Sequence, residues 1–196
     1  YRTGLDVCLV TFDKKSIGQM SCNPAIGGLG KSHIVREIDA LGGIMPIATD
    51  RSGIQYRTLN TRKGDAVQAL RVQCDRELYK KAIQNLLQKT TIHIIEDEVI
   101  DLSVDKKNIA SGVITKNNGA IYSQKVILTT GTFLNGVMYT GDKKTTGGRL
   151  NDFSSIPLSK RLYNLNLPMG RLKTGTPARI KLSSLNINKL EEQPGD

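Results

Sequence analysis

The chain has 196 residues, 38% of them hydrophobic, and a net charge of +10 from 28 lysines and arginines against 18 acidic residues. This apolar content is enough for a hydrophobic core, and no apolar run approaches the roughly 20 residues that a membrane-spanning helix needs. The charge favours an anionic partner such as nucleic acid, a phosphorylated cofactor or an acidic membrane surface, and the alternative is a basic protein from a lysine-rich proteome.

The three cysteines, Cys8, Cys22 and Cys74, show no paired spacing, and no signal or transit segment is visible. This pattern fits a reducing compartment better than a disulfide framework, so we expect a cytoplasmic protein, or a mitochondrial or plastid one if the source is eukaryotic. Both ends of the chain resemble cut points, which predicts a fragment of a longer protein.

The first third of the chain predicts a strand, a glycine-rich loop and a helix. Residues 5–11 are apolar and β-branched and predict a buried strand. A run with four glycines and a proline follows at 18–33. A helical pattern over 31–41 then places Ile34, Ile38 and Leu41 on one face and ends at two glycines.

The rest of the chain predicts one long helix, several strands and a short helix. Asp65 is a plausible N-cap for a helix with apolar residues at helical spacing that fades after Leu87. Strands are expected at 91–95, 99–104 and 125–130, with a hairpin of 109–115 and 120–122 around an Asn-Asn-Gly turn. An amphipathic helix is expected after Pro157.

This order of elements predicts an α/β fold of the nucleotide-binding type. The texture of the sequence changes near Pro168. We therefore expect a partial nucleotide-binding domain over residues 1–165 and the beginning of a second, inserted domain over residues 166–196.

The glycine-rich run matches neither of two common phosphate-binding motifs. A P-loop requires glycine where Ala25 stands, and Pro24 cannot donate to a sheet ladder. The Gly-x-Gly-x-x-Gly fingerprint of dinucleotide-binding folds is also not present in the chain. No spacing of histidine, cysteine and acidic residues predicts a metal site.

Three further features have both a functional and a structural interpretation. Cys22 is a nucleophile activated by a nearby cation or helix N-terminus, a redox partner of another cysteine, or an inert packed residue. The end of the strand at Thr130 and Gly131 allows a ligand to approach the backbone closely, or is an ordinary turn. A basic cluster around Arg62, from Arg57 to Arg76, binds phosphate or simply faces water.

Several short motifs resemble the MnmG (GidA) family of flavoproteins, and their order and spacing hold over about residues 4–180. The motifs are GQMSCNPAIGG (18–28), EIDALGG (37–43), Leu59-Asn60 with Lys63-Gly64 and Ala66-Val67, TGTFL (130–134), GGR (147–149), SIPL (155–158) and GRLKTGTP (170–177). The Gly-Gly-Gly-His-Ala-Gly fingerprint of the family is not in the chain, and neither are its second cysteine and its C-terminal helical domain.

The resemblance implies a Rossmann-like FAD-binding domain of the glutathione-reductase type, without its first strand and fingerprint loop. It implies an enzyme that modifies the wobble uridine of tRNA at C5, adding an aminomethyl or carboxymethylaminomethyl group. NADH and methylenetetrahydrofolate would be co-substrates. A GTPase of the MnmE type would be the partner of a homodimer within a heterotetramer. The alternative is a non-catalytic, nucleotide-dependent RNA-binding or scaffold protein on the same fold.

The resemblance also implies site residues. Flavin contacts are expected at Val99 and Ser155, with Gly27, Gly28, Thr130 and Gly131 as further cofactor-binding residues. The loop that carries Cys22 is expected to line the flavin, with Cys22 as the candidate catalytic residue. The fragment by itself is expected to bind FAD poorly, because the strand and the helix that hold the pyrophosphate are not in it.

Overall fold

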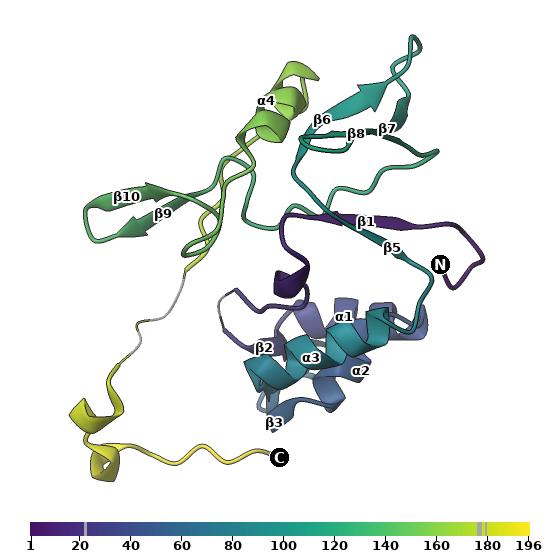
Figure 1. The fold of residues 1–196 in the computed structure, drawn as a ribbon. Helices are drawn as coiled ribbons and strands as arrows, with labels where there is room; N and C mark the ends of the chain where they lie inside the picture. The colour runs from purple at the N-terminus through teal and green to yellow at the C-terminus, as the bar shows by residue number, and fades with distance from the viewer. Residues whose placement is uncertain (22, 176–177, 179) are drawn as a thin grey trace. The chain divides into compact units, whose positions relative to one another are not determined.

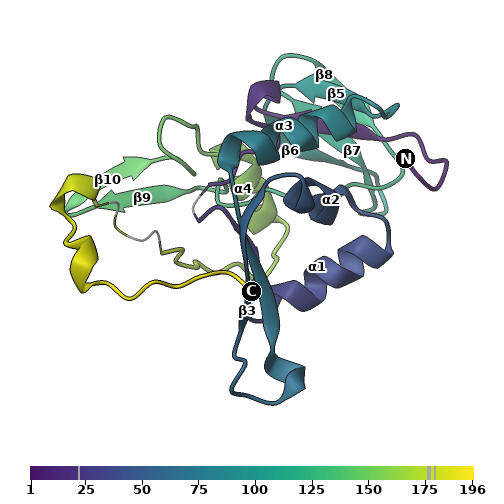
Figure 2. The ribbon, with the colours of Figure 1, turned by 90° about the horizontal axis from the view of Figure 1, so that it is seen from below.

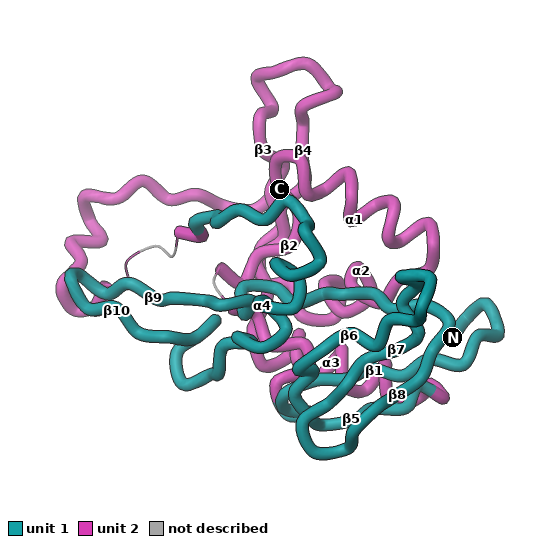
Figure 3. Tube along the Cα trace, turned by 90° about the horizontal axis from the view of Figure 1, so that it is seen from above, with its two compact units in different colours: residues 1–15, 92–173 teal, residues 16–91, 174–196 magenta. Residues whose placement is uncertain are grey.

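The structure is a computed structural model that describes residues 1–21, 23–175, 178 and 180–196. The chain forms two compact units that interleave in sequence (Figure 3). Unit 1 contains residues 1–15 and 92–173, and unit 2 contains residues 16–91 and 174–196. The domain boundary predicted at residue 166 stays a prediction.

Unit 1 combines a parallel strand pair, an antiparallel meander, a hairpin and a helix. Its elements are β1 (Cys8–Thr11), β5 (His93–Glu96), β6 (Val99–Val104), β7 (Ala110–Thr115), β8 (Gly119–Tyr122), β9 (Val137–Thr140), β10 (Lys143–Thr146) and α4 (Ile156–Asn164). Strands β1 and β5 pair in parallel, as Figure 1 shows, whereas β6, β7 and β8 form an antiparallel sheet and β9 pairs with β10.

Helix α4 packs on strand β6 with one apolar face. Leu158 and Leu162 of that face are 3% and 5% exposed. On the rim of the contact, the Arg161 Nε lies 2.9 Å from the Asp101 Oδ1 of β6, although it is not aligned for a hydrogen bond. The predicted amphipathic helix is therefore confirmed, and it covers one face of the meander.

Unit 2 is a three-stranded antiparallel sheet with three helices. Its elements are β2 (Ala25–Gly27), α1 (Lys31–Ala40), α2 (Ile44–Asp50), β3 (Gly53–Leu59), β4 (Ala69–Cys74) and α3 (Arg76–Leu87), with short 3-10 turns at Lys14–Ser16 (shared with unit 1), Asp65–Val67, Leu182–Ser184 and Ile187–Lys189. Strand β4 is central, between β2 and β3. The core lies between the sheet and the helices and contains Ala48, Val72, Cys74, Tyr79, Ala82 and Ile83.

The C-terminal segment of unit 2 runs beside strand β3, as Figure 2 shows at the end marked C. The Gln55 side chain donates a hydrogen bond of 2.8 Å to the Gln193 carbonyl, and the Asp196 backbone N–H donates one of 2.9 Å to the Tyr56 carbonyl. This segment therefore covers part of an edge that a bare strand would leave open.

The long helix predicted from Asp65 is wrong at its start. Residues 69–74 form strand β4, and the helix begins only at Arg76, with Asp75 as its N-cap. The spacing of Val67, Leu70 and Cys74 imitates a helix, but pairing with both β2 and β3 places this segment in the middle of a sheet. Tertiary pairing here overrides the local pattern.

The strand predicted over residues 125–130 is also wrong, because the structure assigns no strand there. A strand exists only through a hydrogen-bonded neighbour, and no strand within the described ranges pairs with this segment. Ile127 is 84% exposed as a result. The strand predicted at 5–11 is shorter than expected and only half-buried, since β1 pairs with β5 alone.

The other predicted elements are confirmed. The first helix, the strands near 93 and 99, and the hairpin with Gly119 at φ 71° all form where expected. The β9–β10 hairpin was not predicted, because its residues show no clear strand pattern. Among the described residues, no helix is long and apolar enough to cross a membrane.

Candidate functional site

The glycine-rich run of unit 2 forms a strand followed by a left-handed turn into helix α1. The Pro24 carbonyl accepts a 2.6 Å hydrogen bond from the Cys74 backbone N–H. Gly27 and Gly28 have φ values of 89° and 92°, which L-residues rarely adopt. The Gly28 N–H donates to the Leu70 carbonyl at 2.8 Å, so the turn is fastened to the central strand.

Packing explains why Gly27 is glycine. A Cβ at this position would lie 2.3 Å from the Leu70 carbonyl oxygen, which is closer than any contact allows. A P-loop, by contrast, joins a strand directly to a helix through a free loop. Here residues 25–27 are themselves in a strand that pairs antiparallel with β4, so the geometry is not that of a P-loop. Cys22 lies outside the described residues, and its predicted role stays a prediction.

In unit 1, three of the sequence motifs meet at Phe133. The Phe133 N–H donates to the Thr130 carbonyl at 3.2 Å, and the Phe133 carbonyl accepts from the Ser155 N–H at 2.8 Å. The Arg149 guanidinium lies 5.4 Å from the centre of the Phe133 ring. Residues predicted from separate motifs, Thr130 and Ser155, are therefore held together through one aromatic residue that the sequence analysis did not single out.

Glycines make this close approach possible. A Cβ at Gly148 would lie 2.5 Å from the Phe133 ring, and Gly131 has a φ of 55°. The Thr132 hydroxyl donates to the Gly148 carbonyl at 2.9 Å, which joins the two turns. The motif that contains Gly148 is thus explained by its contact with Phe133.

A pocket of about 540 Å³ opens next to these residues, within unit 1. Glu98, which precedes Val99, lines it, and so do Ser154 and Ile156 on either side of Ser155. The described residues that line it are Phe12, Glu96, Asp97, Glu98, Lys116, Asn117, Thr146, Asp152, Phe153, Ser154 and Ile156. The two flavin contacts implied by the resemblance therefore flank one and the same pocket.

Asp97 organises the floor of this pocket. It is 5% exposed, and its carboxylate accepts hydrogen bonds of 2.7–2.9 Å from the backbone and side-chain nitrogens of Asn117 and Asn118. The Glu98 N–H donates a further bond of 2.8 Å. Burial alone would raise the pKa of Asp97, but these donors outweigh it and hold the pKa well below its usual range.

The charged side chains of the pocket determine which chemical groups it can accommodate. Among the described residues, four carboxylates line it, from Glu96, Asp97, Glu98 and Asp152, and one cation, Lys116. Glu98 is paired with Lys116 and Asp152 with Arg149, which leaves an excess of negative charge. Such a site repels a pyrophosphate, whereas carboxylates and aromatic rings suit the hydroxyls of a ribose and the flat face of a base. The lining therefore suits a ribose or a base better than a pyrophosphate.

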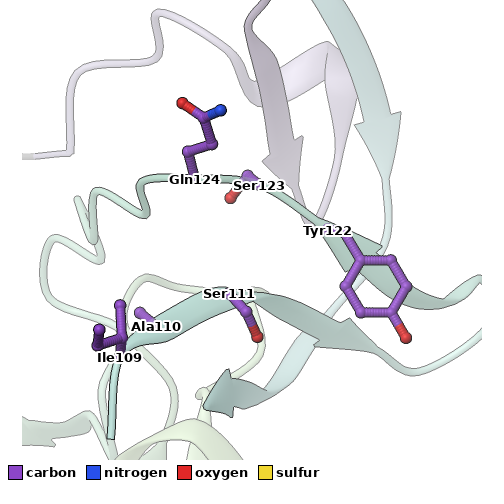
Figure 4. Close-up of a pocket in the computed structure, with 6 residues that line it drawn as sticks. All are labelled: Ile109, Ala110, Ser111, Tyr122, Ser123 and Gln124. Atoms are coloured by element: carbon purple, nitrogen blue, oxygen red, sulfur yellow. The ribbon is translucent and has the colours of Figure 1, made fainter. Parts of the chain in front are cut away.

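A second hollow, of about 620 Å³, lies on strands β7 and β8. Figure 4 shows its lining side chains, with Tyr122 at one end and Ile109 at the other. None of the lining residues carries a charge, and none is a predicted site residue. We assign no ligand to this hollow.

The mixed α/β architecture, with a parallel strand pair and a pocket at its ends, defines the Rossmann-like class of FAD-binding folds, of which the chain is a part. The family model described as "Glucose inhibited division protein A" matches residues 1–196. The chain belongs to this family, usually abbreviated GidA, as the motifs indicated.

Solved structures agree with this assignment. GidA from Aquifex aeolicus matches in two crystal forms, each with a TM-score of 0.90 and 44% identity over 100% of this chain. The match covers 32% of the Aquifex chain, so this chain spans about a third of that length. A GidA-related protein from Thermus thermophilus has a TM-score of 0.58 at 18% identity, covering 84% of this chain and 59% of its own, and shares the fold.

Proposed function

We propose that this chain is part of an FAD-dependent enzyme that modifies tRNA, as the family assignment supports. The observation that carries the proposal is the convergence of Thr130, Gly131 and Ser155 at Phe133, beside a pocket that Glu98 also lines. In this proposal the pocket of unit 1 receives the adenosine half of FAD. Bound flavin would supply the redox chemistry, and the protein residues would position it.

The finer details of the reaction are part of the same proposal and rest on the resemblance. They are modification of the wobble uridine at C5, NADH as reductant and methylenetetrahydrofolate as one-carbon donor. The expected setting is cytoplasmic, with a homodimer that joins an MnmE-type GTPase. The net charge of +10 supports tRNA as the polyanionic substrate.

The catalytic part of the proposal concerns Cys22. Neither of the other cysteines is prepared to act as a thiolate, because burial raises the pKa of the Cys74 thiol and, together with Asp6, that of Cys8. In the full-length protein, Cys22→Ser should leave FAD bound but abolish the modified uridine in tRNA nucleoside analysis. Cys8→Ser, which changes an exposed cysteine, is the control. If the Cys22→Ser protein still produces the modified uridine at the wild-type level, Cys22 has no catalytic role and serves only in packing.

The pocket is tested by filling it. Ile156 lines the pocket and is 37% exposed, so Ile156→Trp in the full-length protein should occupy the space and lower the FAD content of the purified protein severalfold. Tyr163→Trp places the same side chain on the same helix at a position that does not line the pocket. The measurement is the flavin absorbance per protein chain.

The outcomes separate the competing functions. Equal FAD content in both variants would place the cofactor elsewhere. A full-length wild-type protein that is colourless and cannot be reconstituted with FAD would favour the alternative, a non-catalytic RNA-binding or scaffold protein.

A further inference from the structure

The sheet of unit 2 carries two arginines directly opposite each other. The register pairs Arg57 of β3 with Arg71 of β4, so both side chains stand on the same face of the sheet. On the other side of Arg71 the register places Gly27 of β2, which has no side chain to cover it. The core residues Val72 and Cys74 belong to the opposite face.

This arrangement places two positive charges side by side, so it favours an anion beside both arginines. Like charges directly opposite on neighbouring strands repel each other. The Arg71 Nε is buried and has no hydrogen-bond partner among the residues that the structure describes. A buried guanidinium nitrogen without a partner is costly, which points to a ligand that supplies the missing acceptor.

The surroundings carry more positive than negative charge, and Asp196 offsets only part of the charge of the pair. Between residues 53 and 74 the sequence has four cations, Arg57, Arg62, Lys63 and Arg71, and one acid, Asp65, which gives a local charge of +3. Arg57 has a neutral partner, the Gln193 side chain at 3.2 Å, and one acidic neighbour, Asp196. Figure 3 shows the tip of the β3–β4 hairpin, with Arg62 and Lys63 in its loop, projecting beyond the helices of its unit.

We propose that Arg57 and Arg71, opposite each other on one face of the sheet, form a binding site for a phosphate group of a nucleotide chain. Planar guanidinium groups hold two phosphate oxygens at once, and two of them on one face hold a phosphate between them. The exposed cations of the hairpin tip extend the site along a polyanion. The inference rests on the proposed function, because the phosphate is expected to belong to RNA.

The test uses the full-length protein and an unmodified tRNA transcript. Arg57→Gln and Arg71→Gln should each lower the affinity for tRNA about tenfold and reduce the slope of log K against log salt by about one. Arg36→Gln is the matched control, because it removes the same charge from an exposed position on α1 of the same unit. FAD content and NADH affinity are measured on the same preparations.

The results distinguish the sources of the phosphate. Loss of tRNA affinity with normal FAD content and NADH affinity supports the site and assigns it to RNA. Loss of FAD or NADH binding with normal tRNA affinity supports the site and assigns it to a dinucleotide. If both variants behave like Arg36→Gln in every assay, the site does not exist.

Two checks keep the test independent of folding and of the proposed function. Arg57 lies on the outer strand, so Arg57→Gln reports on the site even if Arg71→Gln fails to fold. A wild-type protein that binds tRNA through these arginines but neither holds FAD nor modifies uridine would contradict the proposed function and leave the phosphate site intact.

Discussion

At the scale of single residues, packing explains two positions near the predicted sites. Gly27 was predicted as a cofactor contact, and the structure gives it a second, structural reason to be glycine. Its φ of 89° and the 2.3 Å that would separate an added Cβ from the Leu70 carbonyl oxygen each exclude a side chain. Asp97 was not predicted, yet it joins the β5–β6 turn to the β7–β8 turn.

Gly27→Ala should therefore destabilise the full-length protein even when no flavin is bound. The strained backbone and the clash together should lower the free energy of unfolding by about 1–3 kcal/mol. Gly64→Ala is the control, because its φ is −61° and no atom lies within 4 Å of the added Cβ. Urea unfolding of the apoprotein measures both. Equal unfolding midpoints for the two variants would show that Gly27 is kept only for the cofactor.

Asp97→Asn should lower the free energy of unfolding at neutral pH. Five N–H groups donate to the Asp97 carboxylate, and the amide replaces one of its acceptor oxygens with an NH₂ donor. The pKa of Asp97 is depressed in the folded state, so its stabilisation is complete above the unfolded pKa of about 4 and is lost as the pH falls below that value. The difference between wild type and variant should therefore shrink in acid.

Thermal unfolding at several pH values measures this effect, with Asp142→Asn in an exposed loop as the control. A difference that stays constant from neutral pH to strongly acidic pH would contradict the assignment of the effect to the Asp97 charge.

At the scale of elements, strand β4 shows where local patterns mislead. Its apolar residues fit a helical period, but its two neighbours supply hydrogen bonds on both edges and its residues Ala69, Val72 and Cys74 are buried. The helix starts after Asp75, whose carboxylate accepts a 2.8 Å hydrogen bond from the Leu78 N–H. The N-cap and not the hydrophobic spacing marks the boundary.

The two candidate caps can be compared directly. Asp75→Ala should lower the free energy of unfolding by about 1 kcal/mol, because helix α3 loses its cap. Asp65→Ala, in an exposed 3-10 turn, should change it by less than about 0.5 kcal/mol. Urea unfolding of the full-length variants measures both values. A larger loss of stability for Asp65→Ala than for Asp75→Ala would contradict the assignment of Asp75 as the N-cap and support a helix that begins at Asp65.

At the scale of the whole molecule, the dominant physical property is the charge of +10. Residues 125–130 carry an apolar strand sequence that finds no neighbour within the described chain, and this chain spans 32% of the Aquifex protein that it matches. Experiments on function are therefore designed for the full-length protein.

The charge predicts how tRNA binding should respond to salt. If two to four phosphates are contacted, the affinity of the full-length protein for tRNA should fall by about ten- to 150-fold between about 50 and 200 mM salt. Titrations at several salt concentrations measure the slope, and the flavin absorbance at each concentration shows that the protein remains intact. An affinity that does not depend on salt would exclude phosphate contacts as its source.

The sequence by itself determined the family, the α/β class and most of the elements. Motifs and hydrophobic periods depend on residues close together in the chain, so they can be read from the sequence alone. The motifs and the resemblance also predicted Val99, Ser155, Gly27, Gly28, Thr130 and Gly131 as cofactor contacts, which stays a prediction, and among these are Thr130 and Ser155 of unit 1. Only the tertiary structure decided that these residues meet at Phe133, that residues 69–74 form a strand and that Arg57 faces Arg71. Each of these depends on contacts between segments far apart in the chain, and such contacts leave no periodic signal in the sequence.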